Sequence, residues 1–182
     1  MRSTPHQVTL KQYAFHRAGQ VRAFTLLETL VAVAVLLMAL LGPFAIAQQS
    51  LRSAYYARDQ VTAFYLAQEG VEFVRAVRDE NYLRGTPWLQ GIEEACTQTD
   101  CTVDFTTFTY APCVTACEPL RVSQIGKLFN HATGDQSPFT RTVRITADAE
   151  NPDERIITVR VSWRSSGVSR EFILEERILD WL

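Results

Sequence analysis

The sequence has no aspartate or glutamate before Glu28, although acids and bases nearly balance over the 182 residues, with a net charge of -2. The same stretch carries four basic residues, Arg2, Lys11, Arg17 and Arg22. The near-neutral total gives no overall electrostatic attraction to nucleic acid or to anionic lipid, and we expect no direct nucleic-acid partner. A basic, acid-free start followed by an apolar run is typical of an export or membrane-insertion signal.

Catalytic motifs are also missing from the sequence. It contains no G-x-S-x-G, no H-E-x-x-H and no glycine-rich phosphate loop, and His131 is the only histidine beyond residue 23. Four carboxylates near the cysteines are candidates for calcium ligands: Glu93, Glu94, Asp100 and Asp104. Their spacing is not that of an EF-hand, which favours a solvated acidic loop. We therefore predict a protein that is not an enzyme and holds no cofactor or metal.

Charge is almost absent between Phe24 and Ala47, where Glu28 is the only ionisable residue. This stretch reads FTLLETLVAVAVLLMALLGPFAIA, and a helix of about 20 such residues spans the hydrocarbon core of a bilayer. The basic residues lie on its N-terminal side, which predicts a cytoplasmic N-terminus and an extracytoplasmic C-terminal part. We expect a single-pass protein of the inner (cytoplasmic) membrane.

Neither glycine nor proline interrupts the chain from Gln48 to Glu69, and the helical pattern continues to about Asn81. We predict one long helix over residues 24–81 that is kinked at Pro43, and the alternative is a break between two helices there. An apolar stripe at helical spacing is predicted to pack on the rest of the protein: Val61, Phe64, Gln68, Val71, Val74 and Val77.

Strand patterns dominate after a loop marked by Gly85, Pro87 and Gly91. We predict strands over residues 101–110, 142–146, 157–164 and 172–175, with turns at residues 151–153 and 165–167. An antiparallel meander with one apolar face must be covered, and the outer half of the helix supplies the cover. The predicted fold class is α+β, with four segments: a leader at 1–23, a membrane segment at 24–47, an amphipathic helix at 48–81 and a β-rich domain at 82–182.

Four cysteines, Cys96, Cys101, Cys113 and Cys117, fall in the part predicted to be outside the cytoplasm. An even count in an oxidising compartment favours two disulfides. The alternative is a zinc site, but the C-x4-C and C-x3-C spacings differ from the usual C-x2-C pairs. Local pairing, Cys96 with Cys101 and Cys113 with Cys117, is expected. A nested pairing is the alternative if residues 106–107 turn a hairpin.

The sequence Ala23-Phe24-Thr25-Leu26-Leu27-Glu28 closely resembles the class III signal of type IV pilins and type II secretion pseudopilins. The resemblance implies that prepilin peptidase cuts between Ala23 and Phe24, and that the new amine of Phe24 is methylated. It also implies a pilin-like fold. The family usually has glycine before the cut, so Ala23 predicts slower processing. Residues 67–75 look like the outer helix of many pilin-like proteins, which is a less specific signal.

Glu28 is the residue of the apolar segment that most needs a physical explanation. A carboxylate at the centre of a membrane helix costs about 2.5–3.5 kcal/mol on insertion scales, so it is expected to have a partner. Cleavage before Phe24 creates a cationic amine that a neighbouring, axially shifted subunit can bring to Glu28. The alternative is a glutamate that lies near the cytoplasmic interface, protonated or reaching toward water.

The resemblance implies a structural subunit, a minor pilin or pseudopilin, of a type IV pilus or a type II secretion-like filament. Its implied partners are prepilin peptidase, other pilin or pseudopilin subunits, an inner-membrane assembly platform with its ATPase, and membrane lipid before assembly. Two alternatives are a secreted binding protein whose signal is cut after Ala45-Ile46-Ala47, and a signal-anchored protein that does not polymerise.

Overall fold

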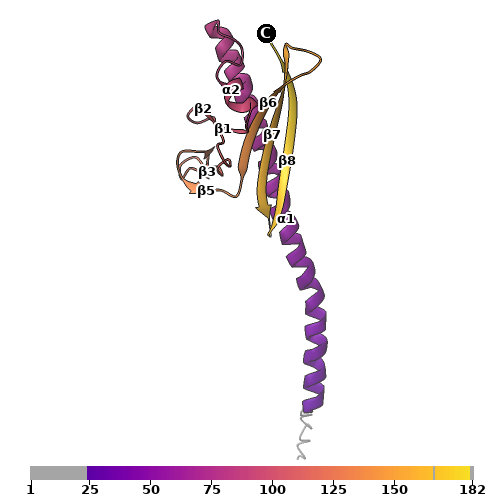
Figure 1. The fold of residues 1–182 in the computed structure, drawn as a ribbon. Coiled ribbons are helices and arrows are strands. Elements are labelled where there is room, and N and C mark those ends of the chain that lie inside the picture. Colours follow the sequence, from indigo (N-terminus) through magenta and orange to yellow (C-terminus); the bar gives the residue numbers. More distant parts are fainter. Residues whose placement is uncertain (1–23, 166, 181–182) are drawn as a thin grey trace, which may run out of the picture. The chain divides into compact units, whose positions relative to one another are not determined.

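The fold is taken from a computed structural model that describes residues 24–165 and 167–180. The chain divides into two compact units, Met1–Ile46 and Ala47–Leu182, and each is considered by itself. Within the described part, the first unit contains only helix. The second unit contains the continuation of that helix, a short second helix and two antiparallel sheets (Figure 1). This is the α+β arrangement expected from the sequence.

Helix α1 runs from Leu26 to Arg84 and is the longest element of the protein. It continues through Pro43, so the alternative of two separate helices is wrong. It also continues past Asn81, where we expected it to end. Gly85 adopts a left-handed conformation with φ of 68°, and its N–H donates to the carbonyl of Tyr82. Glycine just after the last helical turn is a common stop signal, and here it sets the end of α1.

The buried face of α1 differs from the predicted apolar stripe. Val61 and Phe64 are 55% and 39% exposed, and Gln68 is exposed as well. The face that packs on the sheet consists of Ala63, Leu66, Ala67, Gly70, Val71, Phe73, Val74 and Val77. The predicted stripe is confirmed for Val71, Val74 and Val77 and is wrong for Val61, Phe64 and Gln68. Before Val71 the buried face shifts to Ala63, Leu66, Ala67 and Gly70, and at Gly70 helix and sheet lie very close together. A Cβ atom at Gly70 would lie 2.8 Å from Cγ1 of Val159.

The main sheet has five strands in the order β2-β1-β6-β7-β8, and all its pairs are antiparallel. The strands are β1 (Cys101–Asp104), β2 (Thr109–Pro112), β6 (Thr140–Ala147), β7 (Glu154–Ser165) and β8 (Val168–Leu179). β6, β7 and β8 form the meander predicted from their alternating pattern, and they lie along α1 (Figure 1). Their buried residues, such as Val143, Ile157 and Val161, form one core with the buried face of α1.

The segment from Cys101 to Tyr110 is a hairpin, and the single strand expected there is wrong. β1 and β2 are joined by a turn whose last residue, Phe108, has φ of 52°. The carboxylate of Asp104 accepts hydrogen bonds from the N–H and the hydroxyl of Thr106, at 2.8 and 2.6 Å. A side chain that captures the backbone two residues later makes a turn without glycine or proline. The sequence therefore lacks the usual turn signal.

Several short elements were not predicted at all. Helix α2 covers Ile92–Thr97, and a second sheet has the order β4-β3-β5. Its strands are β3 (Arg121–Val122), β4 (Phe129–Asn130) and β5 (Asp135–Gln136). Segments of two residues show no periodicity, so no sequence pattern identifies them.

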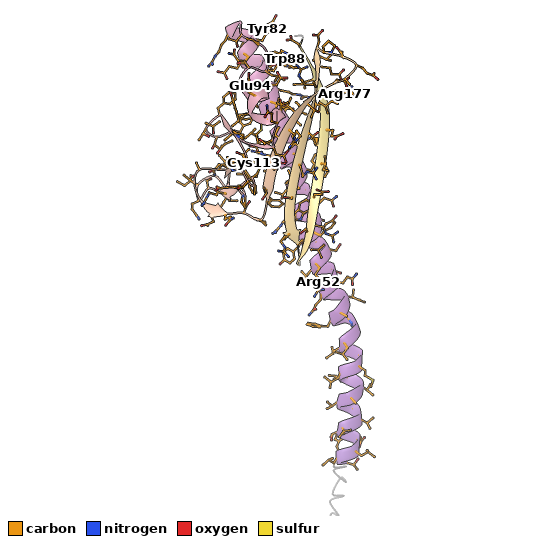
Figure 2. All side chains as sticks on the ribbon, viewed as in Figure 1. Arg52, Tyr82, Trp88, Glu94, Cys113 and Arg177 are labelled. Carbon is orange, nitrogen blue, oxygen red and sulfur yellow. A yellow bond between two sulfur atoms is a disulfide. The ribbon has the colours of Figure 1, made fainter. Side chains whose placement is uncertain are left out.

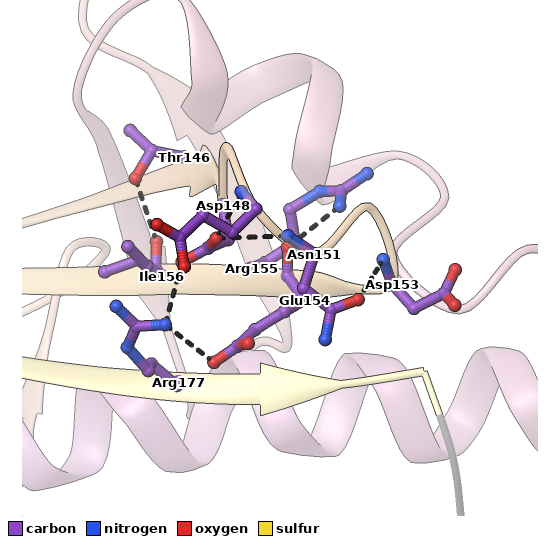
Figure 3. A network of polar contacts seen from close by, with 9 residues as sticks. Thr146, Asp148, Asn151, Asp153, Glu154, Arg155, Ile156 and Arg177 are labelled. Carbon is purple, nitrogen blue, oxygen red and sulfur yellow. Dashed lines mark hydrogen bonds and ion pairs between the residues drawn. The ribbon is translucent and has the colours of Figure 1, made fainter.

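Side chains hold the turn between β6 and β7, where we expected a turn at residues 151–153 (Figure 3). The carboxylate of Asp148 accepts the N–H groups of Glu150 and Asn151, at 2.8 and 3.2 Å. Its other oxygen accepts from Arg177 of β8 at 2.7 Å. The hydrogen bond from Glu150, with smaller contributions from Asn151 and Arg177, lowers the pKa of Asp148.

Candidate functional site

The apolar part of α1 presents its side chains to the outside along its whole length. The large apolar residues of this part are more than half exposed, and they include Leu27, Leu30, Leu36, Met38, Leu41 and Ile46. No residue of its most apolar stretch of 18 residues is buried. This part of α1 is long and apolar enough to cross a membrane. An apolar helix with no cover of its own requires lipid or other protein chains around it.

The first turn of α1 has a cap that was not predicted. The N–H of Glu28 donates to Oγ1 of Thr25 at 3.2 Å, and the hydroxyl of Thr29 donates to the carbonyl of Leu26 at 2.9 Å. The spacing Thr25-x-x-Glu28 is that of a capping box, a signal that was present in the sequence. Glu28 therefore has a local role in addition to the proposed pairing, because a carboxylate in the first turn interacts favourably with the positive end of the helix dipole.

The expected cleavage point lies just outside this helix. Phe24 precedes the first residue of α1 and its side chain is 76% exposed. Ala23, on the other side of the expected cut, lies outside the described residues, as do the four basic residues of the leader. The structure thus places Phe24 just before α1 and Glu28 in its first turn.

The cysteines form two disulfides with local pairing, Cys96 with Cys101 and Cys113 with Cys117. The first disulfide joins α2 to the start of β1, and both of its cysteines are fully buried. The second closes a loop after β2. Residues 106–107 do turn a hairpin, but the cysteines pair locally and not in the nested way. Two disulfides indicate that this part of the protein is extracytoplasmic.

The four carboxylates near the cysteines do not form one cluster. Asp100 pairs with Arg144 and Glu93 pairs with Arg155, each at 2.6 Å. Asp104 is the last residue of β1 and hydrogen-bonds to the turn that follows it. Across residues 24–165 and 167–180, no group of three or more His, Cys, Asp or Glu residues is arranged to hold a metal ion.

Asp104 is a buried anchor between the hairpin and the second sheet. Its carboxylate also accepts the N–H of His131 at 2.7 Å. Burial on its own favours the neutral acid, but the hydrogen bonds from His131 and Thr106 outweigh it and hold the pKa of Asp104 below its usual range. Burial lowers the pKa of His131, and the nearby Arg141 adds to this effect. His131 is therefore held in the fold by the hydrogen bond from its backbone N–H to the carboxylate of Asp104.

Arg141 of β6 is fully buried beneath α1, and we did not predict this. Its guanidinium donates to the carbonyls of Leu66 and Val103, at 3.2 and 2.7 Å, and pairs with Glu69 at 3.1 Å. Burial lowers the pKa of Arg141, and the charge of Glu69 opposes that shift. The predicted strand began at residue 142, one residue too late. Extended to Arg141, the same alternation places this arginine on the inward face with Val143 and Ile145. The contact fixes the sheet on the outer half of α1.

The tryptophans that the structure describes serve packing. Trp163 is buried in the core, and Trp88 packs against the core with the guanidinium of Arg155 5.7 Å from its ring.

Comparisons with protein-family models, with curated proteins and with solved structures gave no match. The architecture, a long N-terminal apolar helix with a small antiparallel sheet, is pilin-like.

Proposed function

We propose that this protein is a structural subunit, a minor pilin or pseudopilin, of a type IV pilus or type II secretion-like filament. The observation that carries the proposal is the exposed apolar start of α1, which has one carboxylate, Glu28, close to its end. A lipid bilayer covers such a helix before assembly, and the helices of other subunits cover it afterwards. The protein acts by assembly and not by catalysis.

Prepilin peptidase is proposed to remove residues 1–23 on the cytoplasmic side and to methylate the amine of Phe24. The amine and Glu28 of one subunit are separated by four residues, or about 6 Å of helical rise. A neighbour shifted along the axis by about that distance brings its amine to Glu28. The two charges then neutralise each other in the apolar bundle, and the pair sets the register of helices that would otherwise slide.

A second exposed surface of α1 supports the same proposal. Beyond the membrane segment, Leu51, Tyr55 and Tyr65 are 58%, 56% and 64% exposed. Arg58 and Thr62 share their helical spacing, so the five residues lie along one face of α1. None of the five belongs to the buried face that packs on the sheet. Neighbouring subunits are proposed to cover this exposed face, in addition to the apolar segment.

The proposed location and partners follow from this role. Before assembly, the subunit is proposed to lie in the inner membrane, with its N-terminus in the cytoplasm and its disulfide-bonded unit outside the cytoplasm. Its proposed partners are the peptidase, other pilin or pseudopilin subunits, and an inner-membrane platform with its ATPase.

Mass spectrometry of the mature N-terminus tests the proposal. We expect the chain isolated from membranes to begin at methylated Phe24. Ala23→Leu is the matched control, because a bulky residue before the cut should leave the leader attached. A mature chain that begins at Gln48 would show a secreted protein and would overturn the proposal. Equally rapid processing of Ala23→Leu would show that the cut lies elsewhere.

A further inference from the structure

Most arginines of the folded unit have carboxylate partners, and the exceptions are not scattered at random. Among the residues that the structure describes, Arg52, Arg164, Arg170 and Arg121 form no ion pair. Arg52 and Arg170 lie where the beginning of α1 in this unit meets the hairpin of β7 and β8, and Arg164 lines a separate, neighbouring cavity of the same hairpin. Arg164 donates to the carbonyl of Gly167 in the hairpin turn.

Arg52 and Arg170 line one open cavity of about 370 Å³. The other lining residues are Gln49, Ser53, Tyr56, Ser165 and Val168. The guanidinium of Arg170 lies over the ring of Tyr56, 5.1 Å from its centroid. Stacking on an aromatic ring fixes the plane of a guanidinium and leaves its N–H groups available to a ligand.

The cavity offers donors of hydrogen bonds and no negative charge. Two guanidinium groups, one amide and three hydroxyl groups line it, and no carboxylate does. The sequence contains no acid between Glu28 and Asp59, and none between Arg155 and Glu171. Glu171, the nearest acid along β8, pairs with Arg160 at 2.6 Å. Paired arginines with hydroxyl donors are a typical arrangement for a phosphate group.

The position of the cavity along the chain indicates where the phosphate comes from. The lining residues of α1, from Gln49 to Tyr56, follow Ala47, the end of the apolar segment, by two to nine positions. A helix rises about 1.5 Å per residue, so Gln49 and Arg52 lie about 3 and 8 Å beyond Ala47 along α1. The headgroup layer extends about 5–8 Å beyond the hydrocarbon core on each side of a bilayer, which reaches these two residues.

We infer that the cavity between α1 and the β7–β8 hairpin binds the phosphate headgroup of an anionic glycerophospholipid while the subunit is in the membrane. Arg52 and Arg170 hold the phosphate, and Arg164 adds positive charge at the hairpin. The site fixes the folded unit against the membrane surface before assembly. This inference rests on the membrane insertion that is part of the proposed function.

The test uses the full-length chain, purified in detergent, and two lipids with the same acyl chains, phosphatidylglycerol and phosphatidylcholine. Native mass spectrometry counts the lipid that stays bound. The apolar helix contacts both lipids equally, so the difference between them reports the headgroup. We expect the parent to retain phosphatidylglycerol preferentially, and this preference to fall by about five-fold for each of Arg52→Gln and Arg170→Gln. Retention of phosphatidylcholine should not change.

The matched control is Arg84→Gln with Arg177→Gln, which removes the same charge elsewhere in the folded unit. Figure 2 shows Arg177 and Arg52 at opposite ends of this unit. Urea unfolding of every variant checks that the fold is intact. The comparison is with the double variant of the cavity, Arg52→Gln with Arg170→Gln. If the control loses the preference as much as this double variant does, net charge alone accounts for the binding and the inference is wrong.

Two further measurements distinguish a phospholipid from a free phosphate and from an acidic protein surface. Added inorganic phosphate should displace little phosphatidylglycerol; complete displacement would identify a free-phosphate site and overturn the lipid assignment. If Arg52→Gln with Arg170→Gln leaves lipid retention unchanged but reduces crosslinking between subunits, the arginines bind an acidic neighbour instead.

Flotation with phosphatidylcholine vesicles tests membrane insertion separately from headgroup binding. A chain that does not float contradicts the proposed function as well as the inference. A chain that floats without any headgroup preference contradicts only the inference.

Discussion

The two parts of α1 belong to one helix but differ in composition and in what covers their apolar residues. In the part before Ala47, large apolar side chains are exposed on all sides of the helix. In the part after Ala47, one face is buried under the sheet, and this face contains Ala63, Ala67 and Gly70. The comparison shows that the distribution of apolar residues around the helix separates the two roles. Apolar residues on all sides suit lipid or other subunits, and an apolar face on one side, with Gly70 at its close approach to Val159, suits packing on a sheet.

The carboxylates of the two parts differ in where their partners lie. Glu28 lies at an exposed end of the apolar segment, and its proposed partner belongs to another subunit. Glu69 has its partner, Arg141, within the same chain. Changes at Glu28 should therefore alter assembly and leave the stability of the folded unit intact. Changes at Arg141 should act first on the stability of the folded unit.

The largest effect is expected for Glu28→Ala. Cleavage and insertion should persist, but incorporation into filaments should fall more than a hundredfold, because breaking half of a buried charge pair costs about 3–5 kcal/mol. Incorporation is measured in sheared filaments or by crosslinking in membranes. Thr25→Ala is the matched control, since it removes the cap and keeps the carboxylate. Glu28→Gln keeps the capping pattern and should be less impaired than Glu28→Ala.

Two results would contradict the pairing role of Glu28. If Thr25→Ala is impaired as much as Glu28→Ala, the carboxylate acts through the helix cap. If Glu28→Ala is processed, stable and incorporated like the parent, no pairing occurs at this position.

The next effect concerns Arg141→Ala, which should destabilise the folded unit by about 3 kcal/mol. It leaves Glu69 and the carbonyl of Val103 without their donor, and Glu69 is partly exposed, which keeps the cost at the lower end for a buried pair. Urea unfolding measures the change. Arg144→Ala is the control, because its pair with Asp100 is exposed and should contribute less than about 1 kcal/mol. Equal losses for the two variants would contradict the anchoring role of Arg141.

The long elements could be predicted from the sequence, whereas the contacts between them could not. α1 and the β6–β8 meander follow from apolar periodicity over many residues. The hairpin at Cys101–Pro112 was missed because Asp104, not glycine or proline, makes its turn. The buried face of α1 was predicted correctly at Val71, Val74 and Val77. It was misplaced before them because Ala63, Ala67 and Gly70 carry little apolar signal. Arg141 was missed because the predicted strand began at residue 142, although alternation with Val143 and Ile145 places residue 141 on the inward face.

A smaller effect is expected for Gly70→Ala. The added Cβ meets Val159 at 2.8 Å, and overpacking costs about 1–3 kcal/mol, which the better helix propensity of alanine offsets by about 1 kcal/mol. The net loss should be about 1 kcal/mol in urea unfolding. Gly42→Ala is the matched control, since nothing lies within 4 Å of its Cβ position. A Gly70→Ala protein as stable as the parent would show that helix and sheet are free to separate slightly.

The smallest effect concerns pH and the folded unit alone. The pKa of Asp104 is lower in the folded state than the value of about 3.9 expected for an unfolded chain. The unfolded state therefore binds the proton first, and the stabilisation is present above about pH 4 and is lost as the pH falls through the folded-state pKa. The pKa of His131 is also lowered, and its contribution is lost in a different window, as the pH falls below about 6.5.

Unfolding by urea between pH 8 and pH 3 separates these two groups. Asp104→Asn should lose about 1 kcal/mol at pH 7, because the charged acceptor of the His131 and Thr106 hydrogen bonds is replaced by a neutral one. It should also lose less stability than the parent below pH 4. His131→Gln is the control, and it should change the slope only near pH 6.5. If Asp104→Asn and the parent show the same acid slope below pH 4, Asp104 does not hold the hairpin through its charge.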